Sequence, residues 1–187
     1  DMTRVHTSSG TTGSITAVLF TLKDIDTWSN LLARCMYMTG ARKEDVFQNT
    51  MGYGLFTGGL GFHYGAEKLG LTIIPSGPGN TKRQIKLIQS FGTTVLHILP
   101  SYALRMRSVF DAVGVDPRKD TKLRIAYIGA EPHTDAMRKR IEEILGIDAY
   151  NSYGLSEMNG PGVAFECQYK NGMHVWEDSY ILEVIDS

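Results

Sequence analysis

Short apolar runs alternate with amphipathic segments along most of this 187-residue chain. The apolar runs have the length and the β-branched content of buried strands. Between them, apolar residues recur at i, i+3 and i+4, which is the pattern of an amphipathic helix. This alternation predicts an α/β fold in which right-handed βαβ units build a mostly parallel sheet with flanking helices. The predicted strands of this part are residues 17–20, 45–49, 71–74, 94–99, 123–128 and 148–153.

Capping residues and glycines mark where the helices between these strands begin and end. Asp24 or Asp26 is expected to cap the first helix, and Thr81 the helix that follows Pro75. The other predicted helices are residues 56–69, 104–113 and 134–145, and Pro132 suits the first position of a helix.

After Gly160 the pattern changes. Residues 163–167, 174–177 and 180–185 resemble strands with no helical stretch between them, which predicts a short antiparallel appendage at the C-terminal end. We therefore expect an α/β core over residues 1–160 and a β appendage over residues 161–187. Since the chain starts with Asp1 and stops directly after a strand-like run, a fragment of a longer protein is expected.

Composition excludes several classes of protein. The 19 Lys and Arg residues are balanced by 20 Asp and Glu residues, so the basic excess of a nucleic-acid-binding protein is absent. No apolar run is long enough to span a bilayer, and no signal peptide is recognisable. The 2 cysteines do not form a disulfide framework. We expect a cytoplasmic protein with neither a nucleic acid nor a membrane as its partner.

One hydroxyl- and glycine-rich segment indicates phosphate binding. It consists of Ser8, Ser9, Gly10, Thr11, Thr12 and Gly13. Glycines let the backbone N–H groups approach a ligand, and the hydroxyls add further donors. The segment matches neither a Walker A loop nor G-x-G-x-x-G. A linker or a hairpin tip is the alternative interpretation.

Two further polar segments follow predicted strands. Tyr153-Gly154-Leu155-Ser156-Glu157 comes after residues 148–153, and Gly129-Ala130-Glu131-Pro132 comes after residues 123–128. Loops at the carboxyl ends of parallel strands converge on one cleft, where α/β sheets bind ligands. Taken alone, Glu157 is either a metal ligand or a helix-start residue.

The three segments SSGTTG, GAEP and YGLSE, in this order, resemble the adenylate-forming acyl/aryl-CoA ligases. The stretch YGLFTGGLG at 53–61, the following HYGAE, and the tail HVWED are similar to the phenylacetate–CoA ligase branch. This resemblance implies a two-step reaction. A carboxylate attacks the α-phosphate of Mg-ATP to give an acyl-adenylate and pyrophosphate, and the CoA thiolate then displaces AMP to give a thioester.

The resemblance also implies residue roles. Ser8–Gly13 would bind phosphates, Glu157 would bind Mg²⁺, and Ser156 would donate to the α-phosphate, which makes Glu157 and Ser156 the catalytic residues. The adenine- and ribose-binding residues would be Gly129, Ala130, Glu131, Pro132, Asn151, Ser152, Tyr153 and Gly154. Tyr53, Phe56 and Gly58 would form the aryl pocket, with the alternative that both rings belong to the core. The expected partners are an aryl acid, ATP and CoA, with a homodimer left open.

Two positions depart from the family pattern. Ser14 stands where a lysine is common after the phosphate segment, and Asn151 stands where an aspartate is common. The family's N-terminal segment and its small C-terminal domain, which carries a catalytic lysine, would lie outside this chain. The chain alone is therefore expected to be inactive. The alternatives are a non-catalytic nucleotide-binding module and an adenylating enzyme that loads a carrier protein.

A structural zinc site is a further expectation. Cys167 and His174 flank a predicted turn at residues 170–172. A thiolate and an imidazole suit tetrahedral zinc, which takes four ligands in structural sites. The resemblance implies that the missing ligands follow Ser187 in a longer protein. The alternative is a buried Cys167 and a solvent-facing His174.

Overall fold

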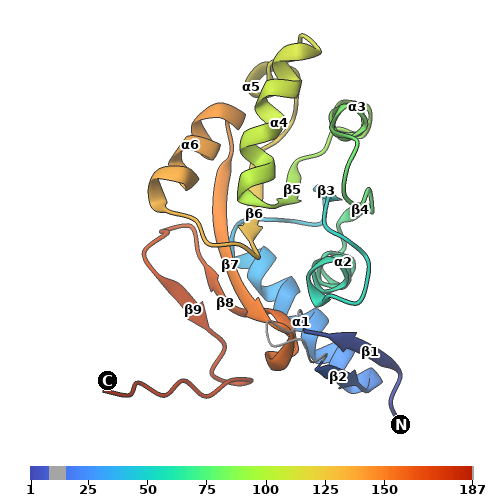
Figure 1. The fold of residues 1–187 in the computed structure, drawn as a ribbon, viewed down its shortest axis with the longest axis vertical. Coiled ribbons are helices and arrows are strands. Elements are labelled where there is room, and N and C mark those ends of the chain that lie inside the picture. Colours follow the sequence, from blue (N-terminus) through green and yellow to red (C-terminus); the bar gives the residue numbers. More distant parts are fainter. Residues whose placement is uncertain (9–15, 187) are drawn as a thin grey trace.

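The computed structural model describes residues 1–8 and 16–186, in which a seven-stranded sheet separates two layers of helices (Figure 1). The sheet has the order β4-β3-β5-β6-β7-β8-β9. Its strands are β3 (Val46–Asn49), β4 (Thr72–Ile74), β5 (Val95–Ile98), β6 (Ile125–Gly129), β7 (Asp148–Leu155), β8 (Gly160–Glu166) and β9 (Met173–Val175). The helices are α1 (Leu22–Met38), α2 (Thr57–Leu69), α3 (Thr81–Phe91), α4 (Pro100–Ala112), α5 (Pro117–Asp120), α6 (Asp135–Leu145) and the 3₁₀ turn η1 (Ser156–Met158).

The strands from β4 to β7 pair in parallel, which confirms the predicted α/β class with a mostly parallel sheet. β8 and β9 pair antiparallel, and they continue the same sheet from β7. Residues 180–185, which were expected to form a strand, are not one. A separate antiparallel pair consists of β1 (Arg4–Thr7) and β2 (Ala17–Phe20), of which the apolar pattern of the sequence predicts only β2. Within the described residues, no helix is both long and apolar enough to cross a membrane.

Alternate strand residues bury against opposite helical layers. On β5 and β6, Val95, Ile125 and Tyr127 pack in the cluster formed with α1 and α2. Their neighbours Leu96 and Ala126 pack in the cluster formed with α3, α4 and α6. Strands covered on both faces need apolar residues at nearly every position, which is why the sequence shows them as continuous apolar runs.

Three helix starts differ from the expectation. Thr21, not Asp24 or Asp26, is the N-cap of α1, and Asp24 completes a capping box with it. Asn80, not Thr81, caps α3 by accepting from the Arg83 N–H at 3.2 Å. The helix expected over 104–113 is α4, which begins earlier at Pro100. Proline suits this first position because its missing N–H would have no intrahelical partner there.

Helices α1 and α2 pack closely because α2 carries glycines where they cross. A Cβ atom added at Gly65 would lie 2.3 Å from the Cβ of Leu32 and 3.1 Å from its backbone carbonyl carbon. At Gly61 an added Cβ would lie 2.3 Å from the indole of Trp28. The indole N–H of Trp28 in turn donates to the Pro161 carbonyl at 2.9 Å, which joins α1 to β8.

We predict that Gly65→Ala lowers the free energy of unfolding by roughly 1–3 kcal/mol, because the new methyl group overpacks against Leu32 and the α1 backbone. The matched control is Gly58→Ala in the same helix, where an added Cβ meets nothing within 4 Å. This control should be neutral or stabilising by up to about 1 kcal/mol, since alanine favours helix. Thermal and urea unfolding of the two variants measure the difference, and equal effects would contradict the close crossing.

Candidate functional site: the carboxyl edge of the sheet

The carboxyl ends of the parallel strands gather the predicted segments at one edge of the sheet. The loop of residues 50–56 connects the end of β3 to α2. It is called the acid loop here because it contains Tyr53 and Phe56, which are predicted to contact the aryl acid. Gly129 ends β6, and the YGLSE residues form the end of β7 and the start of η1. Since β3, β5, β6 and β7 run in the same direction, these segments leave the sheet on the same side.

Of the predicted phosphate segment, Ser9, Gly10, Thr11, Thr12 and Gly13 lie outside the described residues. The two strands that flank the segment are described, and they pair antiparallel with Thr7 opposite Ala17. The Ser8 N–H donates to the Thr16 carbonyl at 3.0 Å, which extends this pairing. The strands that lead into and out of this part of the chain are therefore held next to each other, with Ser8 beside Thr16.

Thr7, the last residue of β1 and the residue directly before the phosphate segment, is bonded to the two other regions. Its carbonyl accepts a hydrogen bond from the Ser156 hydroxyl at 3.3 Å. Its N–H donates to the Leu55 carbonyl in the acid loop at 3.0 Å. The structure thus brings together the start of the phosphate segment, the YGLSE segment and the acid loop, which are far apart in the sequence. Glu157 follows Ser156 on η1 and is exposed.

Two glycines permit close backbone approaches at this edge. A Cβ added at Gly129 would lie 2.5 Å from the Ser152 carbonyl oxygen on neighbouring β7. At Gly154, where the β7–β8 register shifts, an added Cβ would lie 2.3 Å from the Gly160 carbonyl oxygen. Next to it, the Tyr153 ring is 52% exposed and can stack against a planar ligand.

The side chains of Ser152 and Glu131 are bound within the protein. The Ser152 hydroxyl donates to the Ile128 carbonyl at 3.2 Å. The Glu131 carboxylate accepts from the N–H of Ser101 and, at 3.0 Å, from its hydroxyl, so it stabilises the first turn of α4. Glu131 follows Ala130, whose φ is +62°. Pro132 is not the first residue of a helix as expected, because α6 begins at Asp135 after the N-cap Thr134.

Asn151 and Gly58 are two further residues of the predicted site. The Asn151 N–H donates to the Glu166 carboxylate of β8 at 2.7 Å. Gly58 lies in the first turn of α2 and leaves open space where a side chain would be.

The acid loop presents one exposed and one half-buried aromatic ring. Phe56 is 58% exposed, so the alternative that it is a core residue is wrong. Tyr53 is half-buried, and its hydroxyl lies 3.2 Å from Nδ1 of His63. On the other side of the His63 ring, Nε2 lies 3.2 Å from the Glu67 carboxylate. Burial raises the pKa of Tyr53 to about 12, so its hydroxyl stays protonated at neutral pH.

Asn49, at the end of β3, is a structural residue of this edge that the sequence patterns do not predict. Its side-chain N–H donates to the Gly59 carbonyl at 2.8 Å, and its side-chain oxygen accepts from the Met51 N–H at 3.2 Å and lies 3.0 Å from Nδ1 of His97. Its backbone carbonyl accepts from Ser76 and Gly77. This buried residue ties β5, α2 and the loop after β4 to the start of the acid loop.

The buried imidazole of His97 predicts a pH dependence of stability. Burial lowers the pKa of His97 to about 3, whereas an unfolded histidine titrates near 6.5. Below pH 6.5 the unfolded chain takes up a proton that folded His97 does not. The free energy of unfolding therefore falls as the pH falls from about 6.5 to 4.5, by at most about 1.4 kcal/mol per pH unit.

In His97→Gln this slope should be shallower, although part of it remains because burial also lowers the pKa of His6. The matched control is His174→Gln at an exposed position of β9. Urea unfolding across this pH range measures the slopes. If the free energy of unfolding of His97→Gln falls with pH as steeply as that of the control, the low pKa of His97 is wrong.

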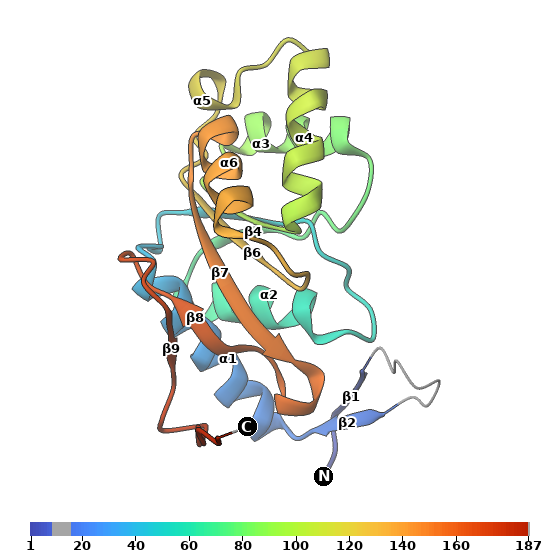
Figure 2. The same ribbon diagram turned by 60° about the vertical axis from the view of Figure 1, so that its left-hand side comes forward.

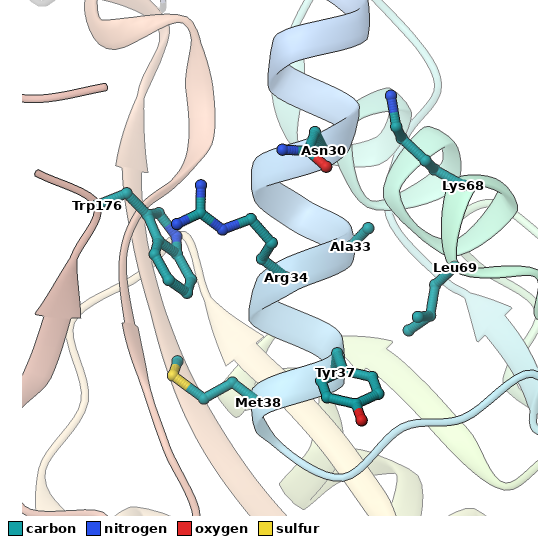
Figure 3. A pocket seen from close by; sticks show the side chains of 8 residues that line it. All are labelled: Asn30, Ala33, Arg34, Tyr37, Met38, Lys68, Leu69 and Trp176. Carbon is teal, nitrogen blue, oxygen red and sulfur yellow. The ribbon is translucent and has the colours of Figure 1, made fainter. Parts of the chain in front are cut away.

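A cavity of about 510 Å³ lies elsewhere, between α1, the end of α2 and Trp176 (Figure 3). The Arg34 guanidinium stacks over the Trp176 ring at 4.0 Å along one wall. Met38 and Leu69, which also line it, precede β3 and β4. The cavity is therefore near the amino ends of these strands, and it contains none of the predicted site residues.

The predicted metal ligands fit their ions to different degrees. Glu157 offers an exposed carboxylate, the type of ligand that Mg²⁺ prefers. Cys167 follows β8, and His174 pairs with Phe165 across the β8–β9 ladder, so both lie on the same hairpin. Nowhere in residues 1–8 and 16–186 do three His, Cys, Asp or Glu side chains form a group suited to a metal ion. The pair alone does not complete a tetrahedral zinc site, and zinc stays a prediction.

Residues 1–180 match the family model of AMP-binding enzymes, so the chain belongs to this family. The chain is also similar to curated phenylacetate–coenzyme A ligases, which confirms the resemblance found in the sequence. It is 49% identical over its whole length to that of Pseudomonas putida and 46% identical over 98% of its length to that of Escherichia coli. In both comparisons the chain spans 42% of the relative's own length.

A solved structure shows the same fold. A 2-hydroxyisobutyryl-CoA ligase in complex with its acyl-AMP and CoA superposes with a TM-score of 0.87 at 28% identity, over 95% of this chain and 38% of the ligase. An anthranilate CoA ligase in complex with anthranoyl-AMP, at 22% identity and a TM-score of 0.68, supports the fold alone.

Proposed function

We propose that this chain is the nucleotide- and acid-binding part of an adenylate-forming ligase. The whole enzyme would convert an aryl acid such as phenylacetate, with ATP and CoA, to aryl-CoA, AMP and pyrophosphate through an acyl-adenylate. The observation that carries the proposal is the junction at Thr7, which joins the start of the phosphate segment to Ser156 and to the acid loop. The similarity to phenylacetate–coenzyme A ligases supports the choice of acid and acceptor.

The arrangement suits a reaction that depends on positioning more than on covalent chemistry. In the proposed complex the hydroxyls and amides of Ser8–Gly13 bind the phosphates, and the exposed Tyr153 ring stacks on adenine. Asn151, Ser152 and residues 129–132 line the nucleotide site. The exposed Phe56 and the half-buried Tyr53 form the aryl wall, next to the open space at Gly58.

Ser156 and Glu157 have the catalytic roles in this proposal. In this proposal the Ser156 hydroxyl, which donates to the Thr7 carbonyl in the ligand-free chain, donates to the α-phosphate instead. Glu157 would hold Mg²⁺, which would supply positive charge to neutralise the triphosphate. Since the chain covers 42% of its relatives, we propose that the parts outside it supply the acceptor contacts, so that residues 1–187 alone form no acyl-CoA.

Glu157→Gln in the full-length enzyme should lower acid-dependent pyrophosphate release about 10²–10³-fold, as expected for loss of one electrostatic contact to the transition state. The loss should be larger at limiting Mg²⁺, because the amide is a weaker ligand than the carboxylate. Glu177→Gln, at an exposed position after β9, is the matched control and should retain the wild-type rate.

The assay is run with a panel of aryl acids and followed by detection of the acyl-CoA. A wild-type rate in Glu157→Gln would remove Glu157 from the mechanism. Pyrophosphate release without thioester would favour loading of a carrier protein. No release with any acid would favour a non-catalytic nucleotide-binding module.

A further inference from the structure

His6 is a buried histidine that lies two residues before the phosphate segment in the sequence. His6 lies in β1, is 1% exposed, and makes T-shaped contacts with the rings of Phe20 and Trp28. Its Nδ1 lies 2.9 Å from the Leu55 carbonyl oxygen. A carbonyl only accepts hydrogen bonds, so Nδ1 carries the proton and donates it to this bond.

The second ring nitrogen of His6, Nε2, makes histidine a costly choice for a position whose only role is to fill the core. Nε2 is buried and has no hydrogen-bond partner among the described residues. Burial lowers the pKa of His6, with the Leu55 bond opposing this shift and the nearby charge of Arg4 adding to it. The ring is therefore neutral, with an unused acceptor in apolar surroundings. A leucine would fill this space without that cost.

The hydrogen bond from His6 to the Leu55 carbonyl helps to fix the acid loop against β1. The same carbonyl also accepts from the Thr7 N–H at 3.0 Å, so β1 holds the acid loop at Leu55 by two hydrogen bonds. Figure 2 shows the end of β1 close to the loop that leads into α2. Leu55 and Phe56 have exposed side chains, and α2 begins after Phe56 without a side-chain cap. Packing therefore does little to fix this end of the acid loop, and the two bonds at Leu55 define its position.

We propose that His6 is a positioning residue for adenylation, because its N–H holds the acid loop in register with the strand that leads into the phosphate segment. This inference rests on the proposed function. The carboxylate oxygen must approach the α-phosphorus in line and to within about 3–3.5 Å, so a displacement of about 1 Å between the two segments slows the reaction strongly. His6 acts through Leu55 and touches neither substrate.

Three variants of the full-length enzyme test the proposal. His6→Leu removes the donor and keeps an apolar side chain, so Leu55 retains only the bond from Thr7. His6→Asn keeps an N–H close to the position of Nδ1. Phe20→Leu disturbs the same aromatic cluster without touching the Leu55 carbonyl.

We expect His6→Leu to lower kcat for pyrophosphate release about 10–100-fold, while the melting temperature stays the same or rises because the unused acceptor is gone. The KM for the acid should increase more than the KM for ATP, and backbone amides of residues 50–56 should exchange hydrogen faster. His6→Asn should recover most of the activity. Phe20→Leu should lower the melting temperature but leave kcat close to wild type.

A wild-type kcat in His6→Leu, an equal loss in His6→Asn, or an equal loss in Phe20→Leu would each overturn the positioning role. These results differ from a failure of the proposed function. In that case the wild-type enzyme releases no pyrophosphate with any acid, and the role of His6 in adenylation falls with it.

Discussion

The carboxyl edge of the sheet depends on the buried hydrogen bonds of Asn49. One amide side chain at the end of β3 binds His97 of β5, the Gly59 carbonyl in α2 and the Met51 N–H at the start of the acid loop. Without water to replace them, these bonds are costly to break, so the group is held as a unit. Burial keeps His97 neutral, and the Phe62 ring stacks on it at 3.7 Å between centroids. The acid loop thus leaves the sheet from a rigid origin.

The far end of the acid loop is fixed by different means. There the Leu55 carbonyl binds β1, and Thr7 of β1 binds Ser156. The loop is therefore held to the sheet at Asn49 and, at Leu55, to β1, the strand that leads into the phosphate segment. An enzyme that joins a carboxylate to a phosphate needs this relationship between two binding regions more than it needs a reactive side chain. The proposed function and the proposed role of His6 both follow from these two points of attachment.

Much of the fold was predictable, because buried parallel strands and amphipathic helices leave periodic patterns that depend on local sequence. Strand β1 was not found, since Arg4 and His6 break the apolar pattern and are accommodated by Tyr64 and Leu55, far along the chain. Residues 180–185 show the opposite failure, because an apolar run forms a strand only where it finds a partner to pair with. The motif segments indicated the edge of the sheet at which the proposed site lies. Asn49 and the Thr7 junction were not predictable, since their hydrogen bonds join segments that no local pattern connects.

We propose that a single acyl-adenylate site spans the phosphate segment, the end of β7 and the acid loop. A crystal structure of the full-length protein with a hydrolysis-resistant phenylacetyl-adenylate analogue tests it most directly. We expect adenine against Tyr153, the phosphate mimic between Ser156 and residues 8–13, and the phenyl ring against Phe56 and Tyr53. An analogue bound instead in the cavity beside Trp176, or a phenyl ring directed away from the acid loop, would contradict it.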